Sequence, residues 1–253
     1  MRFASLGSGS RGNGSIVASQ TTILLVDCGF QYKEVLARLK RLRLDPEDLD
    51  SILVTHEHSD HVSGVEALAN KHSIPVYASR GTWIEIGIDR FDKPFHISGL
   101  FSVGDIDISP VTVPHDAREP LQFVFHCEGT RLGILSDLGS VSPRVIERYQ
   151  DLDAISVEFN HDLELLQRGP YPAFLKTRVS GDFGHLNNAQ ASELLQRIVS
   201  DRLKTVVACH LSETNNDTSR VKQALDDVLE HQDVQRLIAS QSDGLNWIEI
   251  GKP

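Results

Sequence analysis

Short apolar runs recur along the chain and predict β-strands. The runs are rich in β-branched and aliphatic residues and are bounded by turn-forming residues, as expected of strands in a compact fold. They lie at residues 21–29, 49–56, 74–79, 106–115, 121–129, 131–137, 153–160, 204–210, 234–239 and 245–250. The pattern therefore predicts a fold with a large share of β-sheet.

Helical spacing of apolar residues occurs between some of these strands. Residues 34–44 carry apolar side chains close to the 3.6-residue period, and residues 187–200 and 217–231 open on the cap residues Asn187 and Asp217. Strand pairs and strand–helix units are mixed, which favours a layered α/β (α+β) fold over a single doubly wound sheet. No linker rich in proline, glycine or serine divides the chain, so we expect a single domain over its whole length.

The composition is typical of globular proteins. Hydrophobic residues make up 40% and charged residues 24% of the chain, and no apolar run approaches the roughly 20 residues that a membrane helix needs. The N-terminal stretch lacks the apolar core of a signal peptide, so we expect a cytoplasmic protein without a membrane partner. Cys28, Cys127 and Cys209 are too few and too far apart for a disulfide framework, which predicts buried, reduced thiols.

The net charge of −10 excludes a basic surface over the whole protein, of the kind that many nucleic-acid-binding proteins carry. A local basic patch is compatible with this charge. Two bound divalent cations would bring the sum to −6 and would concentrate the change in one place.

Candidate metal ligands stand at the ends of the predicted strands. Each of the following residues comes at the end of an apolar run: Asp27, His56, His115, Asp137 and His210. Strands of one sheet system can place their ends along a common edge, where the sites of layered folds are usually built. The pattern therefore predicts that these residues meet in space.

The stretch VTHEHSDHVSG concentrates histidine and aspartate. His56 and His58 are two residues apart, so on an extended chain they point the same way and can hold one ion. We expect Ser59 to cap a helix that turns Asp60 and His61 toward a second ion. Histidine with carboxylate, and without thiolate, is a donor set for zinc, manganese or iron.

These motifs carry a family resemblance. Asp27, the HEHSDH run, His115, Asp137 and His210, in this order, resemble the five motifs of the metallo-β-lactamase fold superfamily, and the match spans most of the chain. The stretches SLGSGSRGNGS, FNHD, GPYPAFLKTRVSGDFGHLNN and HLSETNN are similar, more narrowly, to the YycJ/WalJ-type branch, a bacterial group of nuclease-like phosphodiesterases. The resemblance implies a four-layer αββα sandwich with a dinuclear metal site between two sheets.

The resemblance also implies two sets of ligands, one for each ion: His56, His58 and His115, and Asp60, His61 and His210. It implies that Asp137 bridges the ions with its two oxygens and that Asp27 holds a ligand in place. The expected cofactors are two divalent metal ions, Mn²⁺ or Zn²⁺, and the donor set also accepts Fe²⁺.

A pair of metal ions about 3.5–4 Å apart can hold and deprotonate a water and stabilise the oxygens of an in-line displacement. The resemblance leaves hydrolysis of β-lactams, lactones, thioesters or phosphodiesters open. Zinc β-lactamases of this fold usually have a cysteine where Asp137 stands, which disfavours that activity. Thioesterases of the glyoxalase II type share the ligands, so the metal site does not exclude them.

Two further histidines favour phosphodiester hydrolysis. His161 and His185 resemble the accessory histidines of phosphodiesterases in this fold, such as tRNA 3′-processing enzymes. A phosphodiester leaves as an alkoxide and needs a proton, which histidine can supply near neutral pH. We predict His185, together with Asp60, as catalytic, and His161 as a contact of the phosphate or leaving group.

Two other stretches are candidates for substrate contact. The glycine-rich loop at residues 7–15 can bring backbone N–H groups to a phosphate or can serve as a plain turn between strands. The resemblance favours a loop beside the active site, with Arg11 and Asn13 as contacts. Lys176 and Arg178 stand beside aromatic residues, which suits single-stranded nucleic acid and equally an ordinary surface loop.

Together these features predict a metal-dependent phosphodiesterase in which a hydroxide bridges the two metal ions. The resemblance favours a nuclease that degrades single-stranded DNA from 5′ to 3′, with RNA as a less favoured partner. Two alternatives stay open: a hydrolase of a small phosphodiester or thioester, and a metal-stabilised binding or regulatory protein without turnover. The complete ligand set argues against the second alternative.

Overall fold

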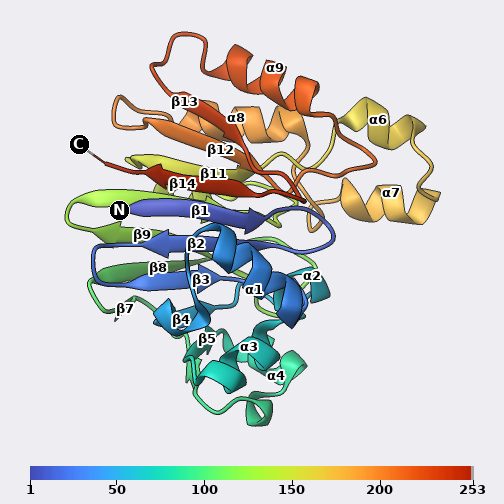
Figure 1. Ribbon diagram of the computed structural model, residues 1–253. Helices are drawn as coiled ribbons and strands as arrows, with labels where there is room; N and C mark the ends of the chain where they lie inside the picture. Colours follow the sequence, from blue (N-terminus) through green and yellow to red (C-terminus); the bar gives the residue numbers. More distant parts are fainter. Residues whose placement is uncertain (252–253) are drawn as a thin grey trace.

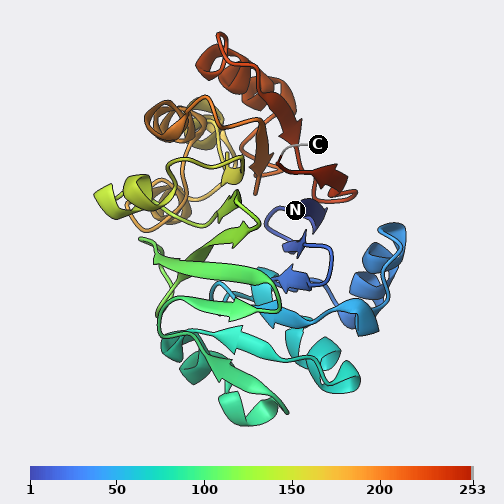
Figure 2. The ribbon, with the colours of Figure 1, turned by 90° about the vertical axis from the view of Figure 1, so that its left-hand side faces the viewer.

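The computed structural model describes residues 1–251, which form two mixed β-sheets with helices along the outer side of each sheet (Figures 1 and 2). The first sheet has the strand order β14-β1-β2-β3-β4-β5-β6. Its strands are β1 (Arg2–Gly7), β2 (Gly14–Ala18), β3 (Ile23–Val26), β4 (Ser51–Leu53), β5 (Val76–Ala78), β6 (Pro94–His96) and β14 (Leu245–Glu249). Pairing is antiparallel from β14 to β3 and parallel from β3 to β6.

The second sheet has the strand order β13-β12-β11-β10-β9-β8-β7. Its strands are β7 (Phe101–Val103), β8 (Ile106–Thr112), β9 (Leu121–Cys127), β10 (Thr130–Leu135), β11 (Ala154–Glu158), β12 (Thr205–Cys209) and β13 (Gln235–Ile238). Pairing is antiparallel from β7 to β10 and parallel from β10 to β13. Strands β8, β10, β11 and β12 therefore all run in one direction, and their carboxyl ends share one edge of the sheet.

Helices follow or connect the strands. The α-helices are α1 (Tyr32–Arg41), α2 (Ser59–Val62), α3 (Val65–His72), α4 (Arg80–Ile86), α5 (Pro143–Arg148), α6 (Leu163–Arg168), α7 (Ala173–Val179), α8 (Asn188–Ile198) and α9 (Thr218–Val228). Two short 3₁₀ helices cover Pro46–Asp48 and Ile88–Arg90. None of the helices within residues 1–251 combines the length and apolarity that crossing a membrane requires.

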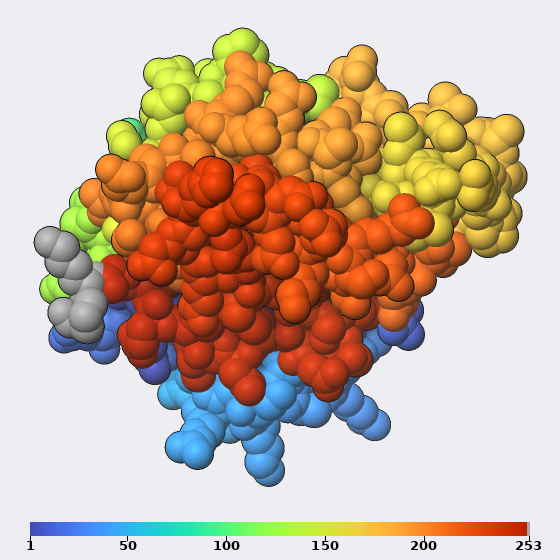
Figure 3. Space-filling view, turned by 90° about the horizontal axis from the view of Figure 1, so that it is seen from above, coloured from blue at the N-terminus to red at the C-terminus, as the bar shows by residue number. Residues whose placement is uncertain are grey.

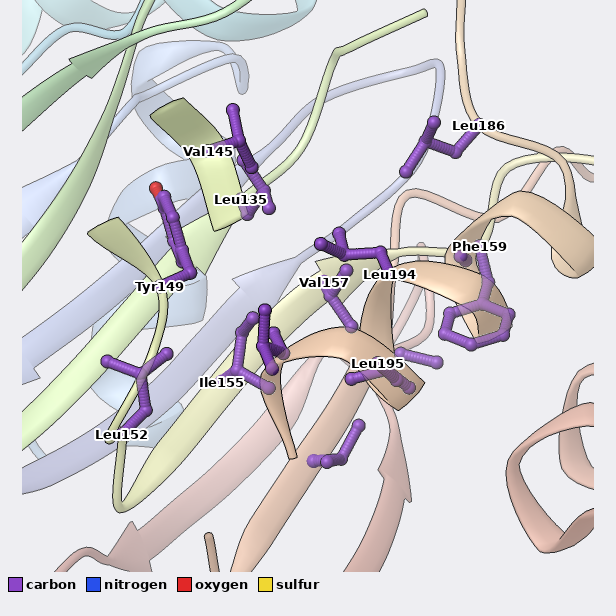
Figure 4. Packing of buried hydrophobic residues seen from close by; sticks show 14 of the residues in the cluster. Leu135, Val145, Tyr149, Leu152, Ile155, Val157, Phe159, Leu186, Leu194 and Leu195 are labelled. Atoms are coloured by element: carbon purple, nitrogen blue, oxygen red, sulfur yellow. The ribbon is translucent and has the colours of Figure 1, made fainter. Parts of the chain in front are cut away.

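Three clusters of buried apolar residues hold the layers together. One cluster lies between the two sheets and includes Phe3, Phe123 and Phe125. A second joins α1 and α3 to the first sheet, and the third joins α5, α8 and α9 to the second sheet. In the third cluster, shown in Figure 4, Tyr149 and Leu195 pack against side chains of β10 and β11. Burial on both faces of both sheets produces the predicted four-layer αββα sandwich.

Every apolar run predicted as a strand is a strand in the structure, although several of the observed strands are shorter. The two predicted caps are also present, because Asn187 accepts a hydrogen bond from the Gln190 N–H and Asp217 accepts one from the Ser219 N–H. The helix predicted to be capped by Ser59 begins one residue earlier than expected, with His58 in the cap position. The three cysteines are buried and unpaired.

Candidate metal centre

The carboxyl ends of the strands bring the candidate ligands to one edge, where α2 and α7 lie in Figure 1. Asp27 follows β3, Asp137 follows β10 and His210 follows β12. All three have positive φ angles, of 59°, 54° and 54°. Residues other than glycine rarely adopt this conformation, which costs about 1–3 kcal/mol and is concentrated at functional sites. The turn takes the chain out of the strand immediately at the site.

One donor group consists of His56, His58 and His115. One ring nitrogen of each lies within 4.8 Å of the others, and Nε2 of His115 is 3.3 Å from Nδ1 of His58. His56 and His115 are buried, while His58 borders a cavity. We call these three residues the first donor group.

A second donor group consists of Asp60, His61 and His210, whose donor atoms also lie within 4.8 Å of one another. Oδ2 of Asp60 is 3.5 Å from Nε2 of His61 and 3.6 Å from Nε2 of His210. Two members come from α2, and the third follows the end of β12 in the second sheet. The group therefore forms only when the two sheets pack together.

Asp137 lies between the two donor groups. Its Oδ2 is 3.4 Å from Nε2 of His61, and its Oδ1 is 4.0 Å from Nε2 of His115. The carboxylate is 2% exposed. A carboxylate so placed can give one oxygen to each of two ions, as the sequence predicts.

Unpaired buried atoms show that this arrangement fits metal ions. Nε2 of His56, Oδ2 of Asp137 and Nε2 of His210 are buried and have no hydrogen-bond partner within residues 1–251. Buried polar atoms in folded proteins nearly always have one. Three exceptions in one cluster of imidazoles and carboxylates match the donor set of divalent transition metals.

The pKa shifts inside the cluster also fit metal binding. Burial and the neighbouring His61 hold the pKa of His56 well below its usual value, which favours the neutral ring that binds metals. Burial opposes protonation of His210, but Asp137 and Asp60 raise its pKa to about 10. The buried carboxylates thus require positive charge, and a divalent cation can supply it in place of protons.

Asp27 supports the second donor group through a contact with His61. Its Oδ2 is 2.8 Å from Nδ1 of His61, and it also accepts hydrogen bonds from the backbone N–H and the hydroxyl of Thr55. A carboxylate on Nδ1 leaves Nε2 of His61 as the nitrogen that faces Asp137. Such a contact fixes the tautomer and orientation of a ligating histidine.

Glu158 is a site residue that the sequence reasoning missed. It ends β11, is fully buried, and its Oε2 lies 2.8 Å from Nδ1 of His185 and 3.0 Å from Nδ1 of His210. Its Oε1 accepts a hydrogen bond from the Leu186 N–H. Burial would raise the pKa of Glu158, but His185 and His210 lower it to about 2, so the group is ionised. The available signal was an acidic residue at the end of the mostly apolar run AISVE.

A cavity of about 360 Å³ opens over the two donor groups. His58, Asp60, Asp137 and His210 form its floor, and the ring of His185 borders it. Residues of α7 line the opposite side. The histidine predicted as catalytic and both donor groups therefore face one space that can admit a substrate.

The two basic residues of α7 are placed differently. Arg178 lines the cavity, and its Nε donates a hydrogen bond of 2.5 Å to Oδ2 of Asp116. Lys176 does not line it, and its Nζ donates to the carbonyl oxygen of Gln167. Asp116 also lies 3.5 Å from Nε2 of His115, so it connects Arg178 to the first donor group.

Three other residues predicted to touch substrate have different surroundings. Asn13 is buried, and its Nδ2 lies 3.2 Å from both Oδ2 of Asp60 and Nε2 of His61, so it contacts the second donor group directly. Arg11 is exposed, lies outside the cavity lining and pairs with Glu213. His161 is fully buried outside the lining, because the backbone of residues 160–161 pairs with the segment that follows His185.

Comparison with known proteins agrees with the fold and the donor groups. A family model described as "Beta-lactamase superfamily domain" matches residues 22–210, which include all the candidate ligands.

The chain belongs to the metallo-β-lactamase superfamily.

Within this superfamily, the chain is 36% identical to exodeoxyribonuclease YycJ of Bacillus anthracis over 236 residues, which cover 91% of this chain and 89% of that one. It is 37% identical to exodeoxyribonuclease WalJ of Streptococcus pneumoniae over 223 residues, covering 85% and 83%. The crystal structure of the metallo-β-lactamase fold protein YhfI from Bacillus subtilis superposes with a TM-score of 0.75 at 17% identity, over 98% and 99% of the two chains. The metallo-β-lactamase fold and its clustered histidines and carboxylates make this chain a metal-dependent hydrolase.

Proposed function

We propose that the chain is a metal-dependent exonuclease that hydrolyses single-stranded DNA. The observation that carries this proposal is the His185–Glu158 contact at the cavity. The ring of His185 borders the cavity beside both donor groups, while Glu158 holds its Nδ1 at 2.8 Å. The exodeoxyribonucleases YycJ and WalJ support DNA as the substrate, since each aligns over more than four fifths of both chains.

The first and second donor groups, with Asp137 between them, are the proposed ligands of two divalent ions, Mn²⁺ or Zn²⁺. When bound, such a pair supplies an activated water and neutralises the charge that develops on a phosphoryl group. Asp27 keeps His61 in the orientation that presents Nε2 to the ion. Asn13 holds the glycine-rich loop against Asp60, which places that loop beside the cavity.

His185 is the proposed general acid. Because the ionised Glu158 accepts the Nδ1 hydrogen, Nε2 is the nitrogen that can give a proton to the leaving oxygen. This hydrogen bond fixes the orientation of the ring. A departing alkoxide needs this proton, whereas the thiolate leaving group of a thioester does not.

A substrate panel tests the proposal. Single- and double-stranded DNA and RNA, labelled at either end, are incubated with the protein and Mn²⁺, beside bis-p-nitrophenyl phosphate and S-lactoylglutathione. We expect the fastest degradation with single-stranded DNA, and the 5′-to-3′ direction implied by the family resemblance predicts early loss of the 5′ label. Asp60→Ala and His185→Ala should abolish this activity. Hydrolysis of the thioester alone would reject the nuclease.

A further inference from the structure

Two exposed phenylalanines are chain neighbours of residues that line the cavity, Leu175 and Gly184. Phe174 is 74% exposed and Phe183 is 62% exposed. Single exposed apolar residues are common on protein surfaces, but two exposed phenylalanines that each adjoin a cavity-lining residue require an explanation. Both belong to residues 163–184, which comprise α6, α7 and the loop that follows, and which we call the α6–α7 arm.

The position of Phe174 follows from helix geometry. Tyr171, Leu175, Arg178 and Val179 line the cavity, and the last three of these recur at the spacing of one face of α7. Phe174 is four residues before Arg178, so it lies at the edge of the same face of the helix. None of the residues of α7 is buried, and the arm stands out at one end of the molecule (Figures 1 and 3).

The position of Phe183 follows from backbone contacts. Its carbonyl oxygen accepts a hydrogen bond from the Asp116 N–H, and Asp116 in turn pairs with Arg178. The next residue, Gly184, lines the cavity. A Cβ at Gly184 would lie 2.2 Å from the carbonyl oxygen of Arg178, so the loop is packed directly on the end of α7. The backbone that carries both rings is therefore held in place.

The arm also differs in charge from the rest of the chain. Residues 163–184 contain three basic and two acidic side chains, whereas the whole chain has 35 acidic and 25 basic residues. Arg178 brings a positive charge to the cavity itself. A polyanion is repelled by most of this protein, so its contacts are favoured on the arm.

We propose that Phe174 and Phe183 are stacking platforms for unpaired bases of a single strand whose scissile phosphate lies in the cavity. This inference rests on the proposed nuclease function and names the feature that selects the substrate. Aromatic side chains beside a cationic groove bind single strands without reading sequence, because every base has a π-face. In a duplex the base faces are covered by their neighbours, so the two rings favour single-stranded over double-stranded substrate.

The test compares Phe174→Ala, Phe183→Ala and the double variant on two oligonucleotides of one length. One oligonucleotide carries all its bases, and the other has abasic sites in the three nucleotides next to the attacked end. We expect the double variant to lose about tenfold or more in kcat/KM on the first and less than twofold on the second. The kcat/KM of the wild-type protein should fall by a similar factor when the bases are removed. The double variant Phe174→Trp with Phe183→Trp should keep the wild-type rate on the oligonucleotide that carries all its bases.

Leu100→Ala is the matched control, because Leu100 is 75% exposed but lies between β6 and β7. It should leave both rates unchanged. An equal loss on both oligonucleotides, or no loss on either, overturns the stacking inference while the nuclease function stands. A wild-type protein that degrades neither oligonucleotide contradicts the proposed function itself.

Discussion

Oε2 of Glu158 lies 2.8 Å from Nδ1 of His185. The carboxylate is fully buried at the end of β11, and the imidazole borders the cavity. The contact joins the interior of the second sheet to the space above the donor groups. It fixes the orientation of a histidine that borders this space, as the proposed general acid requires.

Glu158→Gln tests this contact. Glutamine keeps the size of the side chain but replaces the charged acceptor of the His185 Nδ1 hydrogen bond with a neutral amide. We expect kcat on single-stranded DNA to fall about 10²–10⁴-fold, the range of general acid catalysis, with KM changed far less. In a His185→Gln background the same substitution should cost little more, because the two residues act as one unit. Equal and additive losses would contradict the coupling, and metal content is measured throughout because Glu158 also touches His210.

Asp27→Asn tests the support of His61. Asparagine tolerates the positive φ of this position, so the backbone is preserved, but the charged acceptor on Nδ1 is lost. We expect metal affinity, measured by competition with a chelator, to fall about 10–100-fold. Asp50→Asn is the control, since Asp50 accepts a backbone hydrogen bond from Ile23 on an exposed turn. Equal metal affinities of the two variants would show that Asp27 does not support the metal site.

Arg178→Ala tests the positive charge in the cavity. Removal of a charge-assisted contact to phosphate costs about 1.5–3 kcal/mol, so KM for DNA should rise about tenfold or more while kcat changes less. Arg197→Ala on α8 removes an equally charged and similarly exposed residue that pairs with Glu193 outside the α6–α7 arm. The KM of this control variant for DNA should match that of the wild-type protein. A rise in KM for both variants would indicate a general loss of positive charge rather than a local contact.

Asp162 links stability of the α6–α7 arm to pH. It caps α6 through the Leu165 N–H and pairs with Arg220. Burial raises the pKa of Asp162, but these two contacts outweigh it and hold the pKa below its usual value. The stabilisation is therefore present above about pH 4, the usual aspartate pKa, and is lost as pH falls through the lower folded-state pKa.

Asp162→Ala should lower the free energy of unfolding by about 1 kcal/mol at pH 7, the usual value of a cap. Urea unfolding should show a smaller difference from wild type at pH 3. Asp162→Asn keeps a capping oxygen without the charge, so its deficit at pH 7 should be smaller than that of alanine. A deficit of the same size at both pH values would rule out the ionised carboxylate as its source.

Much of the fold and of the metal site could be predicted because both depend on local patterns. The HEHSDH run sets the spacing of two ligands by chain geometry alone. Strands that end in Asp137 and His210 share one edge of the second sheet once the parallel pairing is known, and Asp27 ends a strand of the first sheet. The strands β6 and β7 are three residues long and partly exposed, so their apolar pattern was too short to indicate a strand.

The surroundings of the predicted contacts could not be derived from sequence. Asn13 and Arg11 are two residues apart, yet one lies against Asp60 and the other pairs with Glu213 at the surface. Only the packing of the glycine-rich loop on the second donor group gives these two residues different surroundings. Glu158 was missed for a similar reason, since its partners lie 27 and 52 residues further along the chain.

Metal stoichiometry tests the central claim most directly. The protein is loaded with Mn²⁺ or Zn²⁺, dialysed, and measured by inductively coupled plasma mass spectrometry together with its melting temperature. We expect two ions per chain and, with free metal at a hundredfold excess over Kd, a gain in the free energy of unfolding of about 3 kcal/mol for each ion, which chelation removes. The double variant His56→Ala with His61→Ala should hold fewer than one ion per chain. Two ions in that variant, or none in wild type, would contradict the dinuclear centre.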